Sequence, residues 1–223
     1  MNSYYAQKLS AERLQHVYAL ASPEVRKYLQ AEIDFLNLRL PSGGRVLELG
    51  CGYGRVLQEV AKPGRHLFGI DTALANLQMA RRFLSEVPTC RLTLMDAGNL
   101  AFAPASFDAV FCIQNGISAF RIEPKTLLKQ ALQVTRPGGR VLFSSYAEAF
   151  WEPRLQWFQE QAKAGLLGEI DLQASTDGVI VTRDGFRSGT ATPEQFRLWS
   201  QDLGHSRQLE EVEGSSVFLE IQP

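Results

Sequence analysis

The sequence predicts an α/β fold in which helices cover both faces of a mostly parallel sheet. Between residues 45 and 145, short apolar segments with strand character alternate with longer segments of helical character. Glycine and proline separate these segments at regular intervals, which distinguishes buried strands from buried helices where periodicity alone cannot. Strands that alternate with helices imply right-handed crossovers and therefore parallel pairing.

Composition limits the class of protein. The 223 residues include 45% hydrophobic side chains, and 23 Lys and Arg stand against 24 Asp and Glu. This content suits one domain with a sizeable core. Because no basic surplus or basic run is present, nucleic acid and anionic membrane surfaces are disfavoured as partners. No apolar run is long enough to predict a membrane span.

Cysteine usage and the start of the chain predict a cytoplasmic protein. Cys51, Cys90 and Cys112 are odd in number and lie in apolar surroundings, which suits a reducing compartment. The first residues show no basic segment followed by an apolar run, so no signal peptide is predicted. His16, His66 and His205 are scattered without ligand spacing, and we expect no metal site.

Residues 1–41 are predicted to form a helical cap. Ser22-Pro23-Glu24 is typical of a helix start, with serine as N-cap and proline at the first helical position. An apolar stripe follows at helical spacing, formed by Val25, Leu29, Ile33 and Leu36. Pro41 and the glycines after it end this helix.

The core is predicted over residues 42–146. We expect strands at 45–49, 66–70, 91–95, 107–113 and 140–145, helices at 53–61, 72–87 and 124–135, and a break at Arg136–Gly139. Asp108, at the start of the fourth strand, is interpreted as structural.

The alternation of strands and helices ends after Tyr146. A helix over 151–167 and a β-rich stretch at 179–182, between Asp-Gly turns, predict an insertion over 147–192. Thr192-Pro193-Glu194-Gln195 has the form of a capping box and opens a helix to about residue 203. Strands at 207–212 and 217–221 follow, so residues 193–223 complete the sheet of a single domain with a helix and a strand pair.

The strongest motif is the turn after the first strand, Gly50-x-Gly52-x-Gly54. Glycine reaches positive φ without a Cβ penalty and lets the backbone approach a ligand closely. A glycine triplet alone is weak evidence, and its place between a strand and a helix gives it weight.

With Glu48 before its first glycine, this turn resembles the first motif of the class I (Rossmann-like) S-adenosylmethionine-dependent methyltransferases. Acids at the ends of the next two strands, Asp71 and Asp96, extend the match, as does Arg136-Pro137-Gly138-Gly139 before the fifth strand. The resemblance covers roughly residues 45–145. It implies a Rossmann-like, mostly parallel seven-stranded sheet whose last strand is antiparallel.

The resemblance also implies a binding site for S-adenosylmethionine. In the family the glycine turn cradles the methionine part, the second acid holds the ribose, the third holds the adenine, and the end of the fourth strand brings sulfonium and substrate together. Carried over to this chain, the predicted cofactor-binding residues are Glu48, Gly50, Cys51, Gly52, Gly54, Arg55, Asp71, Thr72, Asp96, Ala97, Gln114 and Asn115. Ligands of open α/β sheets bind at the carboxyl ends of the strands, where these residues fall.

Other interpretations of single residues stay open. Asp71 and Asp96 also suit helix caps or turns, and the cysteines also suit a thiol site such as that of arsenite methyltransferases. A catalytic residue is not identified, and the candidates are Tyr5, His16, Asn115 and Tyr146.

The predicted function is methyl transfer from S-adenosylmethionine to an O-, N-, S- or C-nucleophile of a small molecule by in-line displacement, with S-adenosylhomocysteine as product. We expect residues 1–40 and 147–192 to form a lid, and the protein to be a monomer or homodimer. The alternatives are a non-catalytic S-adenosylmethionine-binding regulatory protein and a nicotinamide-dependent oxidoreductase, against which the glycine spacing argues. A nucleic-acid methyltransferase is disfavoured by the sequence Gln114-Asn115-Gly116-Ile117 after the fourth strand.

Overall fold

The computed structural model describes residues 8–87 and 89–223, and within them seven strands form one sheet in the order β3-β2-β1-β4-β5-β9-β8. The strands β1 to β5 are parallel to their neighbours in this group, whereas β9 runs antiparallel to both β5 and β8. The predicted fold class, including the antiparallel last strand, is therefore confirmed. The strands are β1 Gly44–Leu49, β2 Arg65–Asp71, β3 Cys90–Leu94, β4 Phe107–Cys112, β5 Thr135–Tyr146, β8 Ser206–Val212 and β9 Ser216–Gln222.

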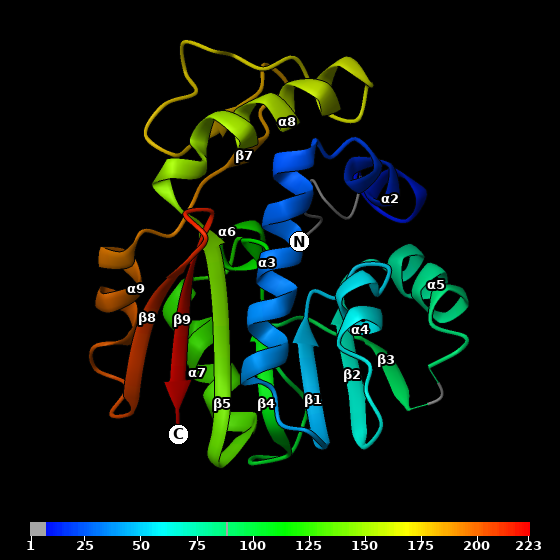
Figure 1. Cartoon of the computed structure of the whole chain (residues 1–223), viewed down its shortest axis with the longest axis vertical. Helices are drawn as coiled ribbons and strands as arrows, with labels where there is room; N and C mark the ends of the chain where they lie inside the picture. Colours follow the sequence, from blue (N-terminus) through cyan, green and yellow to red (C-terminus); the bar gives the residue numbers. More distant parts are fainter. Residues whose placement is uncertain (1–7, 88) are drawn as a thin grey trace.

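Helices cover both faces of this sheet (Figure 1). One apolar cluster joins α3, α4 and α5 to the strands, and a second joins α7 and α9 to the opposite face. The helices of the described part of the chain are α2 Glu12–Ala19, α3 Pro23–Arg39, α4 Arg55–Glu59, α5 Leu74–Phe83, α6 Gly116–Ala119, α7 Pro124–Val134, α8 Trp151–Lys163 and α9 Pro193–Ser200, with a 3₁₀ turn η1 at Glu148–Phe150. Within residues 8–87 and 89–223, no helix is long and apolar enough to span a membrane.

Two helices begin where their capping residues predicted. The Ser22 hydroxyl accepts a hydrogen bond from the backbone amide of Val25 at 3.3 Å, at the start of α3. At the start of α9, Thr192 and Gln195 form the predicted capping box. Such caps satisfy amide groups that the first turn of a helix leaves unpaired.

The predicted break at Arg136–Gly139 is wrong, because these residues belong to β5. Phe107 pairs with Thr135 while Ala109 pairs with Arg140, so a bulge absorbs the extra residues without ending the strand. The Asp108 carboxylate accepts from the backbone amide of Arg45 at 2.6 Å and pairs with the Arg136 guanidinium at 2.6 Å. These contacts agree with the structural role expected for Asp108.

The predicted helix over 53–61 shortens to α4, because the glycine turn continues through Gly54, which has a φ of +88° and stands as the N-cap. A further short helix, α6, follows β4 and was not predicted. Both differences lie at the carboxyl ends of strands.

The helices α2 and α8 and the segment between α8 and α9 lie beyond the carboxyl ends of the parallel strands. Figure 1 shows α2, α8 and β7 above the arrowheads of β1 and β5. A third apolar cluster joins the N-terminal helices to α8, and the Trp157 indole donates to the backbone carbonyl of Val17 at 3.0 Å. Between α8 and α9, β6 Ile180–Val181 pairs with β7 Arg187–Ser188. The predicted turn at Asp177-Gly178 is confirmed by positive φ at both residues.

Candidate active site

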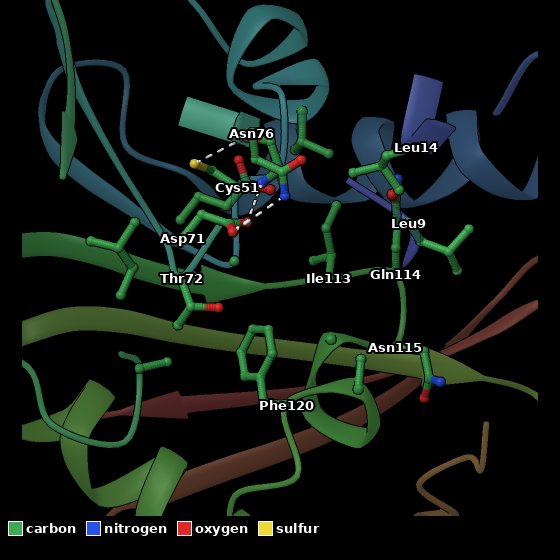
Figure 2. A pocket seen from close by; sticks show the side chains of 18 of the residues that line it. Leu9, Leu14, Cys51, Asp71, Thr72, Asn76, Ile113, Gln114, Asn115 and Phe120 are labelled. Carbon is green, nitrogen blue, oxygen red and sulfur yellow. Dashed lines mark hydrogen bonds between the residues drawn. The ribbon is translucent and has the colours of Figure 1, made fainter. Parts of the chain in front are cut away.

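A pocket of about 420 Å³ opens where β1, β2, β3 and β4 end, within the range of about 300–1,000 Å³ that ligand pockets usually occupy. All predicted cofactor-binding residues except Gly54 line it. Figure 2 shows Cys51, Asp71 and Thr72 on one side of this space and Gln114 and Asn115 on another. The structure therefore brings together residues that lie far apart in the sequence.

The first and last glycines of the turn, Gly50 and Gly54, differ in their surroundings. A Cβ at Gly50 would lie 2.5 Å from the Phe120 ring, and Gly50 has a φ of +73°. A Cβ at Gly54 would instead lie 2.6 Å from Cδ1 of Leu84, on the side of α5. Gly54 is thus required by the packing of α4 against α5, and the structure does not bring it to the pocket lining.

Asp71 holds the glycine turn in place. Its Oδ2 accepts from the backbone amide of Gly52 at 2.9 Å, and its Oδ1 accepts from the backbone amide of Ala73 at 2.7 Å. Asn76 donates to Oδ1 at 3.2 Å, and its own Oδ1 accepts from the Ala11 amide at 2.7 Å. Burial raises the pKa of Asp71, and the amides of Ala73 and Gly52 oppose this shift. A single carboxylate therefore links β2, the turn and, through Asn76, the start of α2.

Asp96 lies in the pocket wall and is exposed. Its Oδ1 accepts from the backbone amide of Gly98 at 2.8 Å. The turn-forming interpretation of Asp71 and Asp96 thus holds for part of each carboxylate, while both side chains also face the pocket.

Glu48 and Arg55 present buried polar atoms without partners. Within the described residues, Oε2 of Glu48 and both Nε and Nη2 of Arg55 lack a hydrogen-bond partner. Burial raises the pKa of Glu48 from 4.5 to about 8, which the Arg55 charge opposes and the Asp71 charge reinforces. Buried polar atoms are rarely left unpaired, so the carboxyl of Glu48 and the guanidinium of Arg55 keep hydrogen-bonding capacity for a ligand.

The end of β4 has a strained backbone. Gln114 and Asn115 have φ values of +57° and +61°, which are unusual for residues other than glycine. The Asn115 side chain donates to the backbone carbonyl of Gly189 at 2.9 Å and accepts from the Ser145 hydroxyl at 2.8 Å. Asn115 therefore ties β4 to the segment before α9.

The catalytic candidates occupy different places. Tyr146 lines the pocket and is buried, with the Arg154 guanidinium 4.5 Å from its ring centroid. Asn115 also lines the pocket, with the bonds just described. His16 is exposed and does not line the pocket. Tyr5 lies outside the described residues.

Several lining residues were not identified from the sequence. Tyr18, Asn76, Met95, Phe120 and Ile122 all face the pocket. Asn76 carried a weak signal, because it stands five residues after Asp71 at the start of a predicted helix. Tyr18 and Phe120 belong to no motif, and only the fold brings them to the site.

Within residues 8–87 and 89–223, no three His, Cys, Asp or Glu side chains gather where they could hold a metal ion. The three cysteines are free, and burial raises the pKa of each thiol. A raised pKa disfavours the reactive thiolate, so these side chains fit packing better than a thiol site.

Two buried carboxyl groups predict that stability falls as pH rises. Burial raises the pKa of Glu48 to about 8 and that of Glu32, on α3, to about 7, from 4.5. From pH 4.5 up to these raised values the folded chain binds more protons than the unfolded chain. The free energy of unfolding therefore decreases over this range, by at most about 1.4 kcal/mol per pH unit for each group, and levels off once the pH exceeds the raised pKa.

We expect the unfolding temperature of the ligand-free protein to fall between pH 6 and pH 9, and to fall less in the Glu48→Gln variant. Glu59→Gln, at an exposed residue of α4, is the matched control and should follow the parent. Thermal unfolding at a series of pH values makes the comparison. Parallel curves for Glu48→Gln and the parent would contradict the assignment.

A mostly parallel sheet with a glycine turn after β1 and a pocket at the strand ends defines a Rossmann-like α/β ligand-binding protein. Residues 46–139 match the family model described as a methyltransferase domain. Demethylmenaquinone methyltransferase of Renibacterium salmoninarum is 30% identical over 189 residues, covering 84% of this chain and 76% of that protein. The enzyme of the same name from Paenarthrobacter aurescens is 26% identical, covering 83% and 70%.

Among solved structures, a protein of Pyrococcus horikoshii superposes with a TM-score of 0.73 at 20% identity, covering 96% of this chain and all of that one (100%). This likeness supports the fold. The chain belongs to the class I S-adenosylmethionine-dependent methyltransferases. It is an enzyme of that class, as the sequence predicted.

Proposed function

We propose that this enzyme transfers the methyl group of S-adenosylmethionine to a small-molecule acceptor by in-line displacement and releases S-adenosylhomocysteine. The observation that carries the proposal is the pair of unpartnered groups beside the glycine turn. Glu48 supplies an acceptor for an ammonium group, and Arg55 supplies donors for a carboxylate. An α-amino acid carries both groups on one carbon, and the methyl donor ends in this unit.

The rest of the pocket suits the nucleoside of the same ligand. In the proposed arrangement Asp71 and Thr72 hold the ribose, since Oδ2 of Asp71 accepts one bond, from Gly52, and keeps capacity for a hydroxyl. Asp96 takes the amino group of adenine. Met95 and Ile122 line the pocket near Asp96 and offer apolar surface to the flat base.

The bound donor supplies an activated methyl group and its own leaving group. The protein therefore contributes to catalysis by orienting the two reactants and excluding water. Orientation can account for about 7–11 kcal/mol of a barrier. A general base is needed only where the nucleophile arrives protonated, as a phenol does. Of the catalytic candidates, Asn115 and Tyr146 line the pocket.

The segments that lie over the pocket support a small molecule as the acceptor. We propose that residues 1–41 act as a cap and residues 147–192 as a lid, because the part of the cap that the structure describes, from residue 8 on, meets the insertion in one apolar cluster. The two relatives described above are named demethylmenaquinone methyltransferases, which makes hydroquinones and other phenols the first acceptors to test. A cytoplasmic location is proposed as well, since the free cysteines suit a reducing compartment.

The test follows a labelled methyl group from S-adenosylmethionine to a panel of hydroquinones, catechols, amines and thiols. We expect at least one acceptor to gain the label while S-adenosylhomocysteine accumulates in equal amount, and Arg55→Leu to reduce both. An enzyme that binds the donor and labels no acceptor of the panel would favour the regulatory alternative. Binding of a nicotinamide nucleotide in place of the donor would favour the oxidoreductase.

A further inference from the structure

Tyr18 lies where α2, the glycine turn and α8 meet. Its ring meets that of Tyr53 edge-on, with 6.1 Å between centroids, and the ring of Trp157 lies 6.1 Å away on the side of α8. Tyr18 is partly buried and lines the pocket. Contacts with the glycine turn and with α8 hold its ring in one place.

Two contacts of Tyr18 reach groups of the pocket. Its hydroxyl donates to Oε1 of Gln114 at 3.1 Å, and the Arg55 guanidinium lies 4.5 Å from its ring centroid. Because Oε1 of Gln114 faces Tyr18, Nε2 of the same amide faces away from it. Within the described residues this buried Nε2 lacks a hydrogen-bond partner, as do Nε and Nη2 of Arg55.

We propose that Tyr18 is a positioning residue that aims the unpartnered N–H groups of Arg55 and Gln114 at the carboxylate of the bound methyl donor. The inference rests on the proposed function, which places an amino-acid end at this part of the pocket. Arginine and glutamine lose considerable rotamer freedom when they are fixed. A neighbour that fixes them before the ligand arrives removes that cost from binding, and the face of an aromatic ring attracts a guanidinium.

Two ligands and two variants separate this role from a general structural one. S-adenosylhomocysteine carries the amino-acid end, whereas 5′-methylthioadenosine shares the nucleoside and the thioether but lacks that end. Tyr18→Phe removes the bond to Gln114 and keeps the ring. Tyr18→Leu removes the ring that faces Arg55 as well.

Calorimetric titration of the full chain measures the affinity of the parent and of each variant for both ligands. We expect Tyr18→Phe to weaken S-adenosylhomocysteine binding about fivefold, as the loss of one hydrogen bond predicts, and Tyr18→Leu to weaken it about thirtyfold, because the guanidinium contact is lost too. Binding of 5′-methylthioadenosine should stay within about twofold of the parent in both variants. Gln15→Ala, at an exposed residue of the same helix, is the control and should change neither affinity.

The outcomes are distinguishable. If both ligands weaken by the same factor, or if both variants bind S-adenosylhomocysteine like the parent, Tyr18 does not position these groups. A parent that binds neither ligand contradicts the proposed function itself. Should Tyr18→Leu be too unstable to titrate, the nearly isosteric Tyr18→Phe decides the question alone.

Discussion

Replacement of Asp71 by alanine should weaken the binding of S-adenosylhomocysteine at least tenfold, a loss of about 1.4 kcal/mol or more. The carboxylate accepts from the amides of Gly52 and Ala73 and from the side chain of Asn76. It therefore shapes the glycine turn and, in the proposed arrangement, holds the ribose. Alanine removes both contributions, and the start of α2 loses the support that reaches it through Asn76.

Asp71→Asn refines this test. Its amide nitrogen cannot accept a hydrogen bond, so one of the two positions now occupied by carboxylate oxygens loses its partner. Calorimetry measures the affinities, and thermal unfolding shows that the variants remain folded. Asp34→Ala is the matched control, because Asp34 is an exposed acid of α3 that bonds Gln30. An affinity of Asp71→Ala within about twofold of the parent would remove Asp71 from the site.

The second large effect is expected on stability. Gly54→Ala should lower the free energy of unfolding by about 2–5 kcal/mol, because alanine at a φ of +88° is strained and its Cβ meets Leu84 at 2.6 Å. Leu84 is buried at the end of α5 and Ala80 lies behind it, so the neighbours have little room to move.

Gly138→Ala separates the two causes. Gly138 has a φ of +74°, and a Cβ at this position would meet no atom of the described residues within 4 Å. Its substitution therefore measures strain alone, about 1–2 kcal/mol. Denaturant unfolding of both variants gives the comparison. Equal losses of unfolding free energy at the two positions would mean that packing against α5 does not require glycine at position 54. The cofactor contact that the family resemblance implies for Gly54 would then regain support.

The sheet could be predicted because local signals and topology agree. The apolar strands, the glycine turn and the caps at Ser22 and Thr192 each mark a boundary that depends on a few neighbouring residues. The break at Arg136–Gly139 was wrong for a reason that sequence does not show: a bulge between β4 and β5 lets glycine and proline stay within a strand.

Some residues of the site could likewise be predicted from the sequence, and others could not. The residues that follow the ends of β1, β2 and β3 could be predicted, because each stands next to a strand and parallel strands end at one edge. Tyr18 and Phe120 could not, since α2 and α6 reach the pocket only through tertiary packing. Gly54 shows the reverse case, in which a residue of the motif serves the packing of two helices.

A crystal structure with S-adenosylhomocysteine bound tests the central claim most directly. We predict that the ligand's ammonium lies within about 3.2 Å of a Glu48 carboxylate oxygen, its carboxylate within the same distance of Arg55, and its ribose hydroxyls on Asp71. A ligand whose amino-acid end points away from Glu48 and Arg55, with those atoms still unpartnered, would contradict the account.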